Sequence, residues 1–98
     1  MTEPFGLIGH IKVQPGRREE LAAILTEGSG GMPGCLSYVV AEDLADPDGI
    51  WVTEVWADRA AHRASLELPA VQAAIARGRQ LIVEFDQFHE TRPLEVDS

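Results

Sequence analysis

The run Ile-Trp-Val-Thr-Glu-Val-Trp at residues 50–56 constrains the fold more than any other part of the sequence. Its β-branched and aromatic content is typical of a strand, in which successive side chains point to opposite faces of a sheet. Trp51 and Val55 would then stand on one face and Trp56 on the other. Because one layer of helices covers only one face of a sheet, the second apolar face needs a cover from elsewhere.

A turn just before this run predicts a β-hairpin. Residues 35–44 have the composition of another strand, and Pro47, Asp48 and Gly49 lie between the two. Proline presets φ for a turn, and glycine relieves strain at its exit. The two strands are therefore expected to pair antiparallel.

The N-terminal third predicts a strand followed by a helix. Residues 5–13 are rich in branched apolar side chains and end at a Gln-Pro-Gly turn. Over residues 17–27 the period changes to that of an amphipathic helix, with apolar positions at Leu21, Ile24 and Leu25. The glycine-rich residues 28–34 follow a helix and lack a Gly-Lys-Ser/Thr ending, so we interpret them as a connection and not as a phosphate loop.

The C-terminal part predicts two helical segments and a last strand. Asp58 is a plausible N-cap for a short helix that reaches Glu67, and Pro69 is placed to begin a second segment that reaches about residue 82. Residues 83–90 have the pattern of a strand. Alternation along this strand places three side chains on one face: Phe85, Gln87 and His89.

The order β-α-β-β-α-β indicates a ferredoxin-like α+β fold, a four-stranded antiparallel sheet with helices on one face. We expect residues 1–98 to form one domain, with its core at about 5–92 and a C-terminal tail at 93–98. The uncovered apolar sheet face exceeds what a monomer usually exposes. This predicts a homodimer in which two sheets press together.

Charge and composition exclude several classes of protein. The 98 residues contain 16 acidic and 8 basic side chains, a net charge of -8, which is the wrong sign for binding nucleic acid. No apolar run is long enough to cross a membrane, and the N-terminus lacks the pattern of a secretory signal, so we expect a cytoplasmic protein. A lone Cys35 forms neither an internal disulfide nor a cysteine-based zinc site, and we interpret it as a small apolar residue.

Three motifs carry a resemblance to a known family. They are Val-Gln-Pro-Gly at 13–16, Pro-Gly-Cys-Leu-Ser-Tyr at 33–38, and Glu-Val-Trp-Ala-Asp at 54–58 followed by His62. In this order and spacing the chain resembles the antibiotic biosynthesis monooxygenase (ABM) domain family over roughly residues 5–92. The resemblance implies a dimeric α+β barrel with a pocket between sheet and helices in each subunit. It also implies cofactor-independent oxygenation of quinol-like or anthrone-like aromatics, or haem degradation.

The resemblance also implies roles for particular positions. The family's tryptophan at the end of the third strand matches Trp56, its helical histidine matches His62, and its second-strand aromatic matches Tyr38. Haem-degrading relatives use an asparagine on the first strand and a histidine in the later helix. Here the first strand contains no asparagine and residues 69–82 contain no histidine, which argues against haem degradation.

A cofactor-free oxygenation needs an apolar pocket, a base and groups that orient the substrate anion. His62 and Glu54 are the two candidate bases, since histidine titrates near neutral pH and a carboxylate in a central strand either finds a partner or has a raised pKa. The alternative for Glu54 is a structural ion pair with one of three arginines: Arg63, Arg77 and Arg79.

Trp56 and Tyr38 are the candidate orienting residues, through an indole N–H or stacking and through a phenolic hydroxyl. His10 is a further candidate for substrate binding, although its place in the first strand also suits the dimer face or a solvated edge. The three histidines of the chain lack the short spacing of local metal-ligand pairs, so we expect no metal.

The sequence thus predicts a cofactor-independent monooxygenase that oxidises a polycyclic phenol, quinol or anthrone-like aromatic with dioxygen. A neutral aromatic is favoured because an acidic protein does not attract anions. The alternative is a non-catalytic dimeric domain of the same fold that binds small molecules or serves in a stress response, because a fold by itself does not fix a function.

Overall fold

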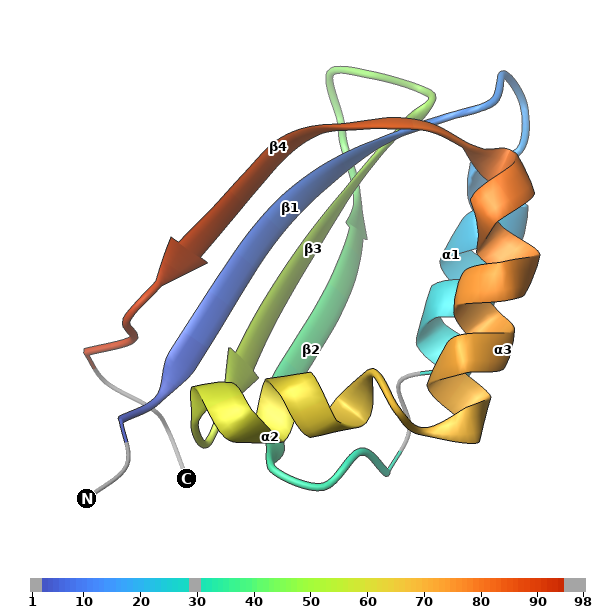
Figure 1. Ribbon diagram of the computed structural model, residues 1–98. Coiled ribbons are helices and arrows are strands. Elements are labelled where there is room, and N and C mark those ends of the chain that lie inside the picture. The colour runs from blue at the N-terminus through green and yellow to red at the C-terminus, as the bar shows by residue number, and fades with distance from the viewer. Residues whose placement is uncertain (1–2, 29–30, 95–98) are drawn as a thin grey trace.

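The computed structural model describes residues 3–28 and 31–94 and contains four strands and three α-helices within these ranges (Figure 1). The strands are β1 (Phe5–Val13), β2 (Cys35–Glu42), β3 (Gly49–Trp56) and β4 (Ile82–Thr91). The helices are α1 (Arg18–Gly28), α2 (Arg59–Ser65) and α3 (Pro69–Gly78), and a short 3₁₀ turn, η1 (Arg79–Leu81), follows α3.

The strands form one antiparallel sheet in the order β2-β3-β1-β4, which confirms the ferredoxin-like α+β fold. The expected hairpin is the pair β2 and β3. Helices α1 and α3 lie side by side over one face of the curved sheet, and α2 follows β3 at one end of it (Figure 1). In the described residues no helix has the length and apolar content that a membrane span requires.

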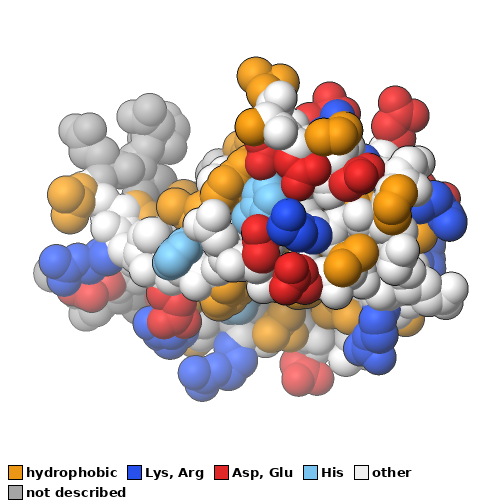
Figure 2. Space-filling model, turned by 90° about the horizontal axis from the view of Figure 1, so that it is seen from above, with side chains coloured by type: hydrophobic (Ala, Val, Ile, Leu, Met, Phe, Trp, Pro, Cys, Tyr) orange, Lys and Arg blue, Asp and Glu red, His pale blue; other side chains and the backbone are white. Residues whose placement is uncertain are grey.

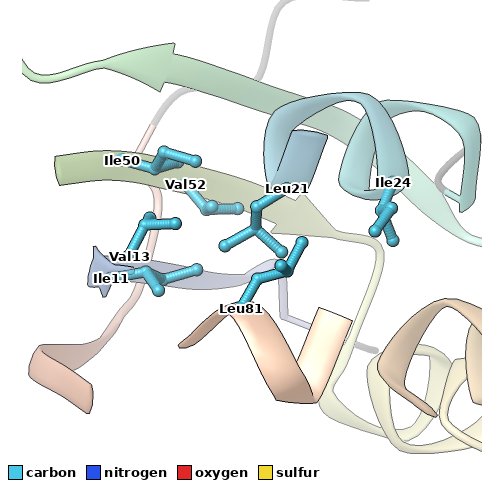
Figure 3. Packing of buried hydrophobic residues seen from close by; sticks show 7 residues of the cluster. All are labelled: Ile11, Val13, Leu21, Ile24, Ile50, Val52 and Leu81. Carbon is cyan, nitrogen blue, oxygen red and sulfur yellow. The ribbon is translucent and has the colours of Figure 1, made fainter. Parts of the chain in front are cut away.

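The core lies between α1 and the central strands (Figure 3). Leu21 of α1 is fully buried against apolar side chains of the sheet. The residues packed together there are Ile11, Val13, Leu21, Ile24, Ile50, Val52 and Leu81. A second, smaller cluster contains Phe5, Leu7 and Trp56. Both clusters lie on the helix-facing side of β1 and β3, because burying apolar side chains is the main favourable term in folding.

Local signals set the ends of α2 and α3. The Asp58 carboxylate accepts a hydrogen bond from the Ala61 backbone N–H at 2.7 Å, which confirms the predicted N-cap. Pro69 begins α3 as predicted, since its missing N–H costs nothing in the first helical turn. The helical segment expected to reach residue 82 ends its α-helical part at Gly78, and β4 already begins at Ile82.

The predicted alternation of β4 is wrong at Phe85. His10 pairs with Gln87 whereas the next residue, Ile11, pairs with Phe85, so Asp86 is an extra residue in β4. Such a β-bulge shifts the alternation by one position. Phe85 therefore shares the helix-facing side with Phe88, and not with Gln87 and His89 as the sequence suggested.

Candidate active site

A cavity of about 590 Å³ lies between the sheet and the helices. All four strands and all three α-helices of the described chain contribute to its wall, and most of that wall is apolar. A volume of this size falls in the range of about 300–1,000 Å³ that is typical of small-molecule sites. The cavity is therefore large enough for an aromatic ligand of several rings.

Four polar side chains line one part of this cavity, and each comes from a position that the sequence singled out. Tyr38 of β2 and Glu54 of β3 are direct cross-strand partners, so their side chains lie next to one another on the same face. Trp56 stands two residues further along β3, and His62 reaches the cavity from α2. The indole of Trp56 meets the His62 ring edge to face at 5.4 Å between centroids.

Glu54 is half-buried, and its carboxylate accepts a hydrogen bond from the Trp56 indole N–H at 3.0 Å. Burial raises the pKa of Glu54, and the Trp56 hydrogen bond and the positive charge that His62 can carry oppose this rise only in part. None of the ion pairs in residues 3–28 and 31–94 includes Glu54, and Arg77 instead pairs with Glu27 at 3.6 Å. For Glu54, the structure therefore favours a carboxylate with a raised pKa over a structural ion pair.

The Trp56 side chain holds the Glu54 carboxylate in place. The Trp56 side chain is packed with Phe5 and Leu7 and is only 1% exposed. Its N–H, which the sequence offered to a substrate oxygen, is donated to the Glu54 carboxylate. Trp56 thus holds the orientation of Glu54 and moderates its pKa.

Tyr38 and His62 supply the remaining polar groups. Burial and the nearby negative charge of Glu54 raise the pKa of Tyr38, so its phenol stays protonated and able to donate a hydrogen bond. The His62 ring is held between two aromatic rings, with Phe5 at 5.6 Å and Trp56 at 5.4 Å between centroids. The Ser65 hydroxyl donates to the His62 carbonyl at 2.6 Å and closes the same turn of α2.

Comparison with known proteins decides the family. The family model for antibiotic biosynthesis monooxygenase matches residues 4–77. This chain belongs to the antibiotic biosynthesis monooxygenase family. The match runs from β1 to residue 77 within α3, a range that includes Tyr38, Glu54, Trp56 and His62, and it supports a monooxygenase-like role in general terms.

Solved structures of this family agree with the fold. A protein of Chloroflexus aurantiacus J-10-fl, provisionally named an antibiotic biosynthesis monooxygenase, is 56% identical with a TM-score of 0.94 and matches over 97% of both chains. A protein of Caulobacter crescentus CB15 with the same provisional name is 19% identical, has a TM-score of 0.86 and covers 96% of this chain and 92% of its own. At that lower identity the similarity shows the fold alone.

A sequence relative is longer than this chain. An uncharacterized protein of Synechocystis sp. (strain ATCC 27184 / PCC 6803 / Kazusa) is 31% identical over 85 residues. The match covers 84% of this chain but only 58% of the Synechocystis protein. This chain thus spans little more than half the length of that relative.

His10 is the one candidate of this ABM-family chain that does not line the cavity. It lies on the opposite face of the sheet, where its ring nitrogens contact Asp43 and Asp86 and its ring packs on Trp51 at 4.5 Å between centroids. The structure therefore brings together His62, Glu54 and Tyr38 with Trp56, and leaves His10 apart from them.

Two aromatic wall residues were missed from the sequence. Phe85 and Phe88 of β4 both line the cavity. They are three residues apart, so simple alternation assigns them to opposite faces. Only the bulge at Asp86 brings both to the same side, and we find no local sequence signal for it.

Over the described ranges, no set of His, Cys, Asp and Glu side chains is arranged to hold a metal ion. Cys35 is half-buried, and burial together with the negative charge of Glu54 raises the pKa of its thiol. A thiol with a raised pKa is a poor nucleophile, in keeping with its interpretation as a small apolar residue.

Proposed function

We propose that this protein is a cofactor-independent monooxygenase that oxidises a neutral polycyclic phenol, quinol or anthrone-like aromatic with dioxygen. One observation carries the proposal: a carboxylate with a raised pKa, Glu54, lies in the wall of a largely apolar cavity of about 590 Å³. A raised pKa makes Glu54 a stronger base than an exposed carboxylate. The cavity gives an aromatic substrate its place beside that base.

Glu54 would remove a proton from the substrate as the first step. The resulting carbanion or phenolate is electron-rich enough to reduce dioxygen itself. For an anthrone, the ring CH₂ group and O₂ become a ring C=O group and H₂O, so the substrate supplies all four electrons. One oxygen atom stays in the product and the other leaves as water.

The neighbouring side chains would support this step. The protonated hydroxyl of Tyr38 can donate a hydrogen bond to the developing oxyanion, and such a bond is stronger beside an apolar wall than in bulk water. Trp56 keeps Glu54 in place through the 3.0 Å hydrogen bond. His62, beside Trp56, is the alternative base, and the variants below separate the two roles.

The test is oxygen uptake with an anthrone or a reduced naphthoquinone in chelator-treated buffer, with isotopically labelled dioxygen to trace the product oxygen. We expect Glu54→Gln to lower kcat/KM by about 10²–10⁴-fold, the usual contribution of a general base. His62→Gln is expected to lose less. Glu67→Gln, the same change at an exposed site outside the cavity, is the matched control.

Two results would contradict this assignment. Equal rates for the wild type and Glu54→Gln would remove Glu54 from the mechanism. Tight binding of the aromatic without oxygen uptake above the rate of autoxidation would favour the non-catalytic binding domain instead.

We also propose that two copies pair through the sheet faces that the helices leave uncovered. The face opposite the cavity carries Val39, which is 50% exposed, together with the half-buried Trp51 and Val55. A second copy of the same sheet offers the same apolar side chains, which is what a self-complementary two-fold interface requires.

A further inference from the structure

Outside the cavity, His10 contacts two further titratable side chains, Asp43 and Asp86, and the three are called the His10 cluster below. His10 is 4% exposed, its Nδ1 lies 2.6 Å from Asp86 Oδ1, and its Nε2 lies 2.8 Å from Asp43 Oδ2. A neutral imidazole has one N–H and can donate to only one carboxylate. With both carboxylates ionised, two such contacts are satisfied only by the doubly protonated imidazolium, flanked by two negative charges.

This cluster joins the two edges of the sheet. Asp43 directly follows β2 and Asp86 belongs to β4, the strands at opposite ends of the order β2-β3-β1-β4. Gly49 of β3 leaves the space that the ring occupies, because a Cβ there would lie 2.8 Å from His10 Nε2. Residues of β1, β3 and β4, together with the residue that follows β2, thus surround the His10 ring.

Asp86 is also the extra residue of the β4 bulge. The bulge places Asp86 on the side of His10 and leaves Phe85 and Phe88 on the side of the cavity. A regular strand of the same sequence would send one of these two rings to the other face. The same bulge therefore accounts for both the Asp86–His10 contact on one face of the sheet and the two phenylalanine rings on the other.

We propose that His10 is a positioning residue for the cavity, which holds the Asp86 bulge in β4 and thereby turns Phe85 and Phe88 together toward the ligand. The inference rests on the proposed function only for the aromatic chemistry of that ligand. It assigns to His10 an indirect role in specificity, in place of the direct contact with substrate that the sequence suggested.

The charges around His10 favour its protonated form. Burial lowers the pKa of His10, but the hydrogen bonds and charges of Asp86 and Asp43 outweigh burial and raise it overall. Lys12 of the same strand pairs with Asp46 at 3.7 Å and also helps to lower the pKa of Asp86. A view from above shows a histidine side chain among acidic side chains, with a basic side chain beside them (Figure 2).

The test uses the affinity for 2-naphthol, followed by its fluorescence at about pH 7 with no oxygenation involved. We expect His10→Gln to raise the Kd by up to about tenfold, because the ligand loses the packing contact of one aromatic ring in the cavity wall. His89→Gln, the same substitution at an exposed position of β4, is the matched control and should leave the Kd unchanged.

A rescue variant separates positioning from a general structural role. Deleting Asp86 in the His10→Gln background restores regular alternation with both phenylalanines on the cavity side, so the Kd should return close to that of the wild type. Cross-strand NOEs report the register directly, since Gly9 pairs with Phe88 and Ile11 with Phe85 in the wild type. The nitrogen chemical shifts of His10 report whether both ring nitrogens carry protons.

An unchanged Kd in His10→Gln, a neutral His10 ring in the wild type, or a failure of the deletion to restore binding would each overturn the proposal. If His10→Gln does not fold, the Asp86→Asn variant and the ring nitrogen shifts give the same decision. None of these readouts depends on oxygen chemistry, so they stand whether or not the protein is a monooxygenase.

Discussion

The reactivity of Glu54 depends on two opposing influences of its neighbours. Burial raises its pKa, and the Trp56 N–H, at 3.0 Å, stabilises the ionised form and limits the rise. A change at Trp56 therefore alters the basicity of Glu54 without any change to the carboxylate itself. The same pairing explains why an apolar wall tolerates a carboxylate at all.

This balance gives a signed pH prediction. Trp56→Phe removes the hydrogen bond that lowers the pKa of Glu54, so that pKa should rise further above its ordinary value of 4.5. Because the base must be ionised to act, the acidic limb of the kcat/KM profile should move to higher pH. The measurement is oxygen uptake over a pH series, with Glu67→Gln at an exposed site outside the cavity as the control. An acidic limb that stays in place would show that Glu54 is not the titrating base.

The His10 cluster has its own pH signature. The raised pKa of His10 gives a stabilisation that is complete below 6.5 and is lost as pH rises through the folded-state value. The lowered pKa values of Asp43 and Asp86 give one that is complete above 3.8 and is lost as pH falls. Urea unfolding should therefore show the largest gap between wild type and His10→Gln between these two values. A gap that does not vary with pH would contradict the charged cluster.

Helix α2 is short and brings His62 to the cavity wall. With only seven residues, it depends on its cap and on its contacts with β3 more than on helix propensity. The Asp58 carboxylate satisfies a backbone N–H that would otherwise have no partner in the first turn.

We expect Asp58→Ala to lower the free energy of unfolding by about 1 kcal/mol, as loss of an N-cap usually does. Urea denaturation followed by circular dichroism measures this. Asp58→Asn preserves a capping side chain and should stay within a few tenths of a kcal/mol of the wild type, on the order of typical cap differences. Equal losses in both variants would mean that the charge of Asp58, and not its cap, stabilises α2.

Strand β1 offers a way to fill the cavity without disturbing the fold. Gly9 lines the cavity, and a Cβ at this position would meet only Gln87 and Phe88 at ordinary distances of 3.8 and 3.9 Å. Gly9→Ala should therefore fold and bind normally, whereas Gly9→Leu should fill part of the cavity and weaken 2-naphthol binding by about tenfold or more. Fluorescence titration checks this, and full affinity in Gly9→Leu would place the ligand elsewhere.

For the whole molecule, the apolar sheet face opposite the helices is the feature that a single chain leaves unexplained. A homodimer would give a light-scattering mass of twice the 10.7 kDa of the chain. Val39→Asp puts a charge on this face and should shift the mass to that of the monomer, because burying an unpaired charge is costly. Ala73→Asp, the same charge on the exposed surface of α3, should leave the dimer intact. A monomeric wild type would remove the case for this interface.

Local patterns in the sequence were enough to predict the helices and strands, their order and four of the polar residues that line the cavity. The alternation in residues 50–56, the Pro-Asp-Gly turn and the Asp58 cap act over a few residues, so local patterns predict them well. Glu54, Trp56 and Tyr38 reach the cavity because strand alternation and hairpin register carry them there.

The surroundings of His10 and the face of the sheet on which Phe85 lies depend on contacts that form only in the folded chain. The bulge in β4 places Asp86 against His10, which is 76 positions away in the chain. The partner of Glu54 was equally open, because the sequence suggested one of three arginines, whereas packing places the Trp56 indole N–H against the carboxylate. Contacts between distant residues arise only when the sheet assembles, and a one-residue shift in register is enough to move a side chain to the other face.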